Sequence, residues 1–130
     1  EQMWMEDGTK EYEEYREYFM EQLYMDSLLA DYPFEKETLY EILELLVETV
    51  CSRRKTIRIA GDDKPAQIVT SRLMKLNGEH IRYVLACMKE NTTKVRNIRQ
   101  YLLAALYNAP ATISNYYAAL VNHDLYGGGG

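Results

Sequence analysis

The sequence predicts an all-α fold, a compact bundle of about six short helices with one short extended segment near residues 56–59. Apolar residues recur at three- and four-residue steps through most of the chain, which is the spacing of amphipathic helices. Proline, glycine and Asn-Thr clusters interrupt this pattern at short intervals. A chain of 130 residues with 47% hydrophobic content is long enough for one domain with a core and no disulfides.

The first helix is predicted to run from Thr9, its N-cap, to about Leu29. Its apolar stripe is Tyr12, Tyr15, Phe19 and Leu23, and the Asp-Tyr-Pro sequence at 31–33 ends it. Residues 1–8 show no period and predict a flexible lead-in. Residues 9–126 then form a single helical domain, and residues 127–130, all glycine, form a flexible tail.

The clearest amphipathic pattern follows in residues 39–50, which predicts a helix facing the core. Its apolar positions are Leu39, Ile42, Leu43, Leu46, Val47 and Val50. Residues 56–59 alternate in polarity and predict a short strand, for which the pattern offers no pairing partner. Gly61 begins a turn, and Asp63 and Pro65 predict the cap and first turn of the next helix.

The remaining elements are three further helices. Asn77 is the predicted N-cap of a helix that ends at the Asn-Thr-Thr sequence of 91–93. A second helix follows from there to Ala109, with Val95, Ile98, Leu102, Ala105 and Leu106 on its buried face. Pro110 ends it, and a last short helix over residues 113–121 is expected to close the bundle.

The sequence contains no recognisable catalytic or metal-binding motif. His80 and His123 have no second ligand at metal-binding spacing, and Cys51 and Cys87 are expected to be buried thiols. Asp62 and Asp63 suit turn and capping roles better than cation binding. We therefore expect no enzyme activity, catalytic residue, metal or cofactor. With no apolar run long enough for a bilayer span, we expect a cytoplasmic protein without membrane association.

Charge is divided unevenly along the chain. Residues 1–50 hold fifteen acidic residues against three basic ones, a net charge of −12, whereas residues 51–130 hold twelve basic residues against five acidic ones, a net charge of +7. The candidate partner- or DNA-binding residues are Arg53, Arg54, Lys55, Arg58, Lys94, Arg96 and Arg99, with Tyr107 as a neighbouring anchor. The favoured alternative is that these cations pair with carboxylates of the same domain.

The first helix carries the opposite charge. Its five central glutamates, Glu11, Glu13, Glu14, Glu17 and Glu21, are most simply a solvated face. Because tyrosines are interleaved among them, this helix is also a candidate docking or dimerisation surface.

Three segments resemble the C-terminal domain of the replication initiator protein A family of plasmids and conjugative elements of low-GC Gram-positive bacteria. They are ETVCSRRKTIRIAGDD (48–63), KLNGEHIRYVLACMKENTTKVRNIRQYLLAALYNAP (75–110) and YYAALVNHDLYGG (116–128). The resemblance implies a DnaD-like helical domain that recruits host replication proteins while a separate domain reads the origin. Ala109 stands where DnaD-type domains carry a tryptophan.

Residues and resemblance together lead to one principal hypothesis. The chain is expected to be a non-enzymatic module of a plasmid-type replication initiator that recruits a helicase loader, helicase or primase to the origin. The alternatives are an auxiliary DNA-binding domain that uses the same cations, and a dimerisation or spacer domain. The sequence leaves the oligomeric state open.

Overall fold

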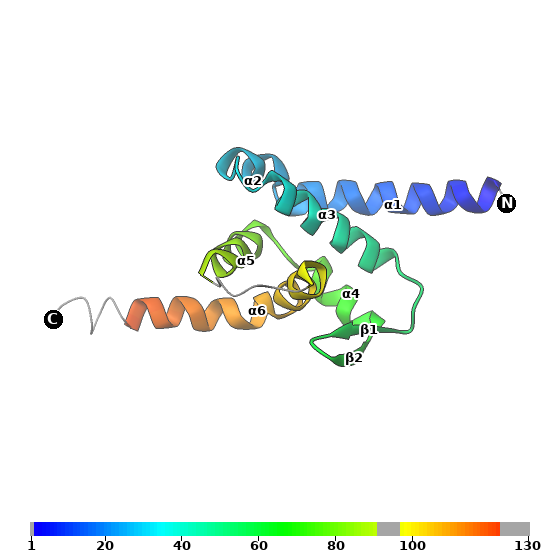
Figure 1. The fold of residues 1–130 in the computed structure, drawn as a ribbon. Helices are drawn as coiled ribbons and strands as arrows, with labels where there is room; N and C mark the ends of the chain where they lie inside the picture. Colours follow the sequence, from blue (N-terminus) through cyan, green and yellow to red (C-terminus); the bar gives the residue numbers. More distant parts are fainter. Residues whose placement is uncertain (1, 91–96, 123–130) are drawn as a thin grey trace.

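The computed structural model describes residues 2–90 and 97–122, with side chains for residues 8–90 and 97–119. Within these residues the fold is mainly helical, as predicted, with a small two-stranded sheet (Figure 1). The elements are α1 (Gln2–Gln22), α2 (Met25–Asp31), α3 (Lys36–Cys51), β1 (Thr56–Ile59), β2 (Asp62–Pro65), α4 (Ala66–Met74), α5 (Gly78–Glu90) and α6 (Ile98–Asn122). The predicted glycine tail lies outside the described residues.

The first predicted helix is in fact two helices, and it begins earlier than predicted. α1 begins at Gln2, so residues 2–8 are helical and Thr9 is not an N-cap. Tyr24 adopts a left-handed conformation, with φ of 54°, which separates α1 from α2. This turn keeps both Leu23 and Met25 fully buried. Apolar periodicity alone did not reveal it because the stripe continues on both sides of the break.

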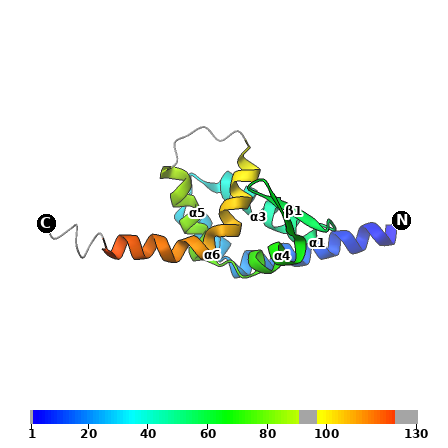
Figure 2. The same ribbon diagram turned by 90° about the horizontal axis from the view of Figure 1, so that it is seen from below.

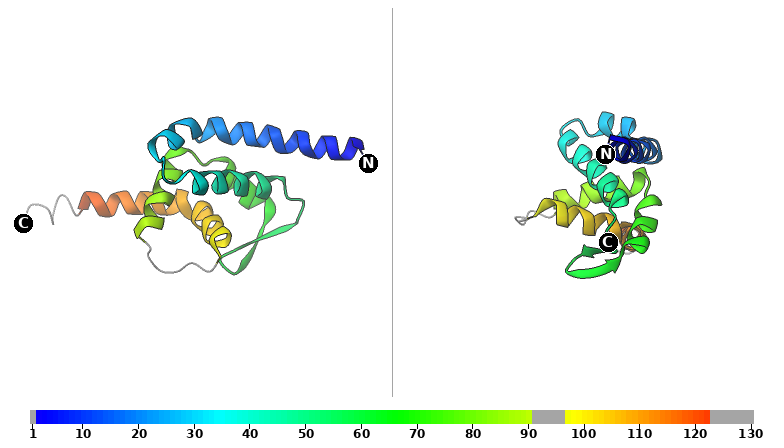
Figure 3. Two further views of the ribbon diagram at one scale, coloured as in Figure 1. Left: turned by 45° about the horizontal axis from the view of Figure 1, so that its top comes forward. Right: turned by 90° about the vertical axis from the view of Figure 1, so that its right-hand side faces the viewer.

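Helix α3 is the centre of the fold. All six positions of its predicted stripe are buried, as are Leu45 and Thr49. α1 lies along one side of α3, and α4 and α6 contact the other side (Figure 3). Because α3 has packing partners on two sides, its buried surface is wider than the stripe that the sequence predicts.

The predicted strand at 56–59 is confirmed, but it does have a partner. β1 pairs antiparallel with β2, so that Ile59 lies opposite Asp62 and Thr56 opposite Pro65. A two-residue turn of Ala60 and Gly61, both with positive φ, joins the strands. β2 includes Asp63, so this residue does not cap α4, which begins after Pro65. Its polar composition concealed this edge strand.

The start of α5 is fixed as the sequence predicts. The side-chain oxygen of Asn77 accepts hydrogen bonds from the backbone N–H groups of Glu79 (3.0 Å) and His80 (3.3 Å). In return, Nδ1 of His80 accepts the backbone N–H of Asn77 at 3.0 Å. His80 thus takes the place of the glutamate or glutamine of a capping box, and its ring nitrogen has a hydrogen-bond partner within the fold.

Pro110 bends α6 instead of ending it, so the two helices predicted on either side of it are one. α6 runs from Ile98 to Asn122 with Pro110 inside, and Figure 2 shows the change of direction. A proline has no N–H to donate and its ring displaces the preceding turn. The Arg72 guanidinium of α4 donates to the Tyr107 carbonyl at 3.5 Å, which gives a partner to a carbonyl beside the bend.

Candidate interaction surface

The basic residues Arg53, Arg54 and Lys55 lie in the connection between α3 and β1. α3 ends at Cys51 because Ser52 takes an extended conformation, and the Ser52 hydroxyl oxygen accepts the backbone N–H of Arg54 at 3.3 Å. At the other end, the Lys55 carbonyl accepts the backbone N–H of Ala66 at 2.9 Å. We call residues 53–55 the basic loop. Its three side chains are exposed, and among the described residues none of them forms an ion pair.

A groove of about 490 Å³ lies beside the basic loop, between the end of α3, strand β1 and the first turns of α6. Leu45, Ile57 and Leu103 supply its apolar side chains. Three of the predicted site residues, Arg54, Arg58 and Arg99, line the same groove together with the acidic Glu48. We call this the α3–β1–α6 groove. The β1–β2 hairpin brings Arg58 to this groove, and the sequence pattern of residues 56–59 did not predict the pairing that orients β1.

Arg58 and Arg99 differ from the basic loop because both have carboxylate partners within the fold. Arg58 lies directly opposite Asp63 in the hairpin, with 3.3 Å between its guanidinium nitrogen and the carboxylate oxygen. Both side chains are well exposed, so this pair contributes little to stability. Arg58 therefore stays accessible at the rim of the groove.

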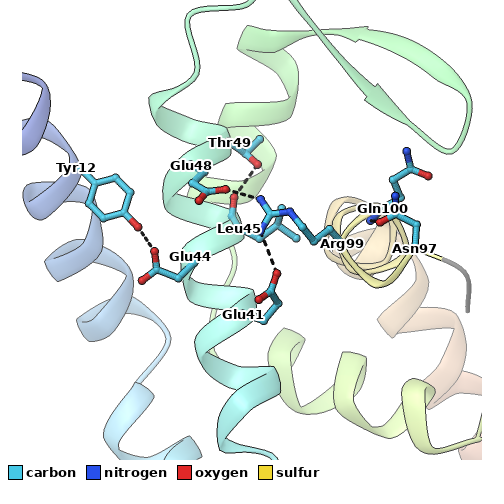
Figure 4. A network of polar contacts seen from close by, with 9 residues as sticks. All are labelled: Tyr12, Glu41, Glu44, Leu45, Glu48, Thr49, Asn97, Arg99 and Gln100. Carbon is cyan, nitrogen blue, oxygen red and sulfur yellow. Dashed lines mark hydrogen bonds and ion pairs between the residues drawn. The ribbon is translucent and has the colours of Figure 1, made fainter.

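Arg99 joins α6 to α3 through two carboxylates. Its guanidinium donates to Glu41 at 3.0 Å and also to Glu48 (Figure 4). The Glu48 hydrogen bond and both carboxylates raise the pKa of Arg99 above its ordinary value. The alternative of internal pairing therefore holds for Arg99, and its contact with a partner stays a prediction. Glu41 and Glu48 are separated by about two turns of α3, so both face the first turn of α6.

Tyr107 is not an exposed anchor. It is only 6% exposed, and the Arg72 guanidinium lies 4.3 Å from its ring centroid. The reason is that α4 and α5 both pack on α6, which gives this helix a second buried face. Conversely Ile98, predicted to be buried, is 42% exposed at the start of α6. Lys94 and Arg96, as well as Val95 and His123, lie outside the described residues.

The tyrosines of α1 are largely engaged within the fold. The Tyr12 hydroxyl donates to Glu44 (Figure 4), and the Tyr18 hydroxyl donates to the Met74 carbonyl at 2.6 Å. Burial and the Glu44 hydrogen bond raise the pKa of Tyr12 to about 12. The five glutamates of this helix are exposed, as the solvated-face interpretation expects. Because these hydroxyls already have partners within the fold, the arrangement does not support the hypothesis of a tyrosine-rich docking face on α1.

Groups that would indicate other chemistry are not brought together in the described part of the chain. No cluster of three His, Cys, Asp or Glu side chains suitable for a metal ion occurs there. Cys51 and Cys87 are free thiols that are half-buried rather than buried, and burial raises the pKa of Cys51. None of the described helices is both long and apolar enough to cross a bilayer.

A family model described as "Family of unknown function (DUF6017)" matches residues 6–128, which is nearly the whole chain. No curated protein and no solved structure matches the chain.

Proposed function

The chain belongs to this family of unknown function, and from its own residues we propose that it is a non-enzymatic docking module that binds an acidic segment of another protein. The observation that carries the proposal is the basic loop beside the α3–β1–α6 groove, which combines apolar and charged side chains. The resemblance of residues 48–63 and 75–110 to replication initiators suggests the process. In that process the partner is a host helicase loader, helicase or primase.

The basic loop supplies charge that the fold itself does not use. Arg54 lines the α3–β1–α6 groove and also, with Arg53, a second hollow against α4 that includes Gln67 and Ser71. The loop thus has a recess on each side. Charges placed in this way increase the encounter rate with an oppositely charged partner and orient it, while apolar contact in the groove supplies affinity.

The groove suits a peptide better than a nucleic acid backbone. Its apolar side chains, Leu45, Ile57 and Leu103, offer nothing to phosphates. Arg58 and Arg99 already have carboxylate partners, which leaves Arg54 as the cation of the groove without one among the described residues. The net charge of −5 also opposes DNA at longer range. A protein segment that alternates acidic and apolar side chains satisfies both the basic loop and the groove.

The test uses two triple variants of equal charge. Arg53, Arg54 and Lys55 are replaced by glutamate in one, and Lys10, Lys36 and Lys75, which are exposed elsewhere, in the other. Binding of purified host helicase loader, helicase and primase is measured by biolayer interferometry. We expect one of them to bind the wild type and the second variant alike and the basic-loop variant at least tenfold more weakly.

Two results would contradict the proposal. One is that none of the three proteins binds, or that the basic-loop variant binds as well as the wild type. The other is that duplex or single-stranded DNA binds instead, with affinity that falls steeply between 50 and 200 mM salt and disappears in the basic-loop variant. The second result would establish the auxiliary DNA-binding alternative.

A further inference from the structure

The second half of α6 extends away from the rest of the molecule. We call residues 111–122 the arm. In Figures 1, 2 and 3 it continues beyond α5 without another described element alongside its far end. The sequence pattern predicts that this segment closes the bundle, and the prediction is wrong because α6 bends at Pro110 and the segment extends outward.

The arm has no charged side chains. Residues 100–122 contain no Asp, Glu, Lys, Arg or His, although 27% of the whole chain is charged. Its exposed side chains are small or neutral: Ala111, Thr112, Ser114, Asn115, Tyr117, Ala118 and Ala119. Tyr117 is 46% exposed. An exposed helix of a charged domain normally carries charge on its solvent side, so the arm is unusual in presenting only small or neutral side chains there.

Contact with the rest of the fold holds the arm near its middle. The Tyr116 ring packs edge-on against Tyr83 of α5, with 5.3 Å between the ring centroids, and against Tyr117 at 5.7 Å. A single helix of about 12 residues is marginal in water, and the arm has no i,i+4 ion pairs to support it. Its far end therefore gains stability chiefly by packing on something else.

We infer that the arm pairs with the arm of a second copy of this chain. A charged partner surface would lose hydration against the arm and find no opposite charge there. Another arm offers a matching surface, because the arm belongs to the longest stretch without charge among the described helices. Two arms related by a two-fold axis would cover one another, and the alanines and Ser114 would let the helices approach closely.

The size of the arm sets the strength of the association. Twelve helical residues span about 18 Å, so a pair of arms buries well under the roughly 800 Å² per partner of a standard stable interface. We therefore expect a dimer that dissociates in the micromolar range. Such a dimer would present two basic loops, and its formation does not depend on the docking function proposed above.

Sedimentation velocity over a wide range of protein concentrations tests the inference. The wild-type mass should rise from monomer to dimer with concentration. Ala118→Glu should weaken the dimer at least tenfold, because two-fold symmetry places two like charges in one interface. Ala30→Glu, the same change at an exposed alanine of α2, should leave the dimer unchanged. Tyr117→Glu and Tyr40→Glu form a second matched pair, with 46% and 42% exposure of the two tyrosines.

Charge complementation provides the decisive control. Ala118→Glu and Ala118→Lys proteins should each be largely monomeric, whereas an equimolar mixture should recover a dimer of mixed composition. Circular dichroism of each variant establishes that the domain is folded. A wild type that stays monomeric to several hundred micromolar overturns the inference, and so does a dimer that resists both arm substitutions.

Discussion

Two cationic regions that look alike in the sequence have opposite surroundings in the fold. The basic loop, Arg53 to Lys55, projects into solvent, and among the described residues its side chains have no carboxylate partner. Arg99 instead joins α6 to Glu41 and Glu48 of α3. The difference comes from where the acids lie. Glu41, Glu44 and Glu48 occupy the side of α3 between α1 and α6, whereas the basic loop begins only after this helix has ended.

This difference separates a stabilising role from a recognition role. On α3, Glu44 accepts a hydrogen bond from Tyr12 and pairs with Arg16, both of α1. Glu41 and Glu48 pair with Arg99 of α6. One row of glutamates thus contacts the two helices on either side of α3. The basic loop follows the C-terminus of α3, where the helix dipole favours positive charge. Cations are therefore tolerated there without specific partners, which leaves them available to another molecule.

The largest expected effect comes from reversing the charge that the fold does use. Arg99→Glu places a third carboxylate beside Glu41 and Glu48, and we expect it to lower the free energy of unfolding by roughly 1–2 kcal/mol. Urea denaturation followed by circular dichroism measures this. Replacing the three basic-loop residues by glutamate should change stability by less than about 0.5 kcal/mol.

Salt provides the control for this pair of variants. The stability difference between wild type and Arg99→Glu should shrink in 1 M NaCl because these side chains are half-exposed and screened. If the basic-loop variant proves as unstable as Arg99→Glu, the loop cations have structural partners and the comparison fails.

The second prediction concerns the contact between Tyr12 of α1 and Glu44 of α3. Tyr12→Phe removes the hydroxyl that donates to Glu44 and should destabilise the fold by about 1 kcal/mol. Because the pKa of Tyr12 is raised to about 12, its contribution is fully present below pH 10 and is lost between pH 10 and 12. The stability difference between wild type and variant should disappear over that interval. A constant difference would show that Glu44 is not its partner.

The third prediction addresses the hairpin that supports the basic loop. Ala60 has φ of 52°, a conformation that costs a residue with a Cβ about 1–2 kcal/mol. Ala60→Gly removes this cost but makes the unfolded chain more flexible, so we expect a net gain of roughly 0.5–1 kcal/mol. Thermal unfolding measures the gain. Partner binding should stay unchanged, and a loss of stability would mean that the turn is not of this type.

Features that depend on nearby residues in the sequence were the predictable part of this fold. The α3 stripe and the Asn77 cap were correct because each depends on neighbours in the sequence. Three boundaries were wrong for reasons that lie elsewhere in the chain. Tyr24 is left-handed because α1 and α2 pack on different parts of the core. Strand β2 forms because β1 pairs with it. Helix α6 continues beyond Pro110, and Arg72 of α4 donates a hydrogen bond to the nearby Tyr107 carbonyl.

The candidate site was half predictable for the same reason. Density of charge identified the basic loop, and no local signal separated it from Arg99, whose partners are 58 and 51 positions away. Tyr107 failed as an exposed anchor because helical spacing gives one buried face, and α6 has two. The groove itself depends on Ile57, Leu45 and Leu103, which converge only in the fold.

The smallest expected effect on stability concerns His80, a neutral side chain that, like Arg99, has a hydrogen-bond partner within the fold. Nδ1 of His80 accepts the Asn77 N–H, which requires an unprotonated nitrogen, and partial burial lowers the pKa of His80 below 6.5 against the opposing influence of Glu79. Folding thus favours the neutral ring, so its contribution is present above pH 6.5 and is lost as the pH falls through the lowered value. His80→Ala should cost about 0.5 kcal/mol at pH 7.5, measured by urea denaturation, because the hydrogen bond is half-exposed. The cost should vanish in acid, whereas a cost that grows below pH 6 would mean that the imidazolium, paired with Glu79, is the form that the fold stabilises.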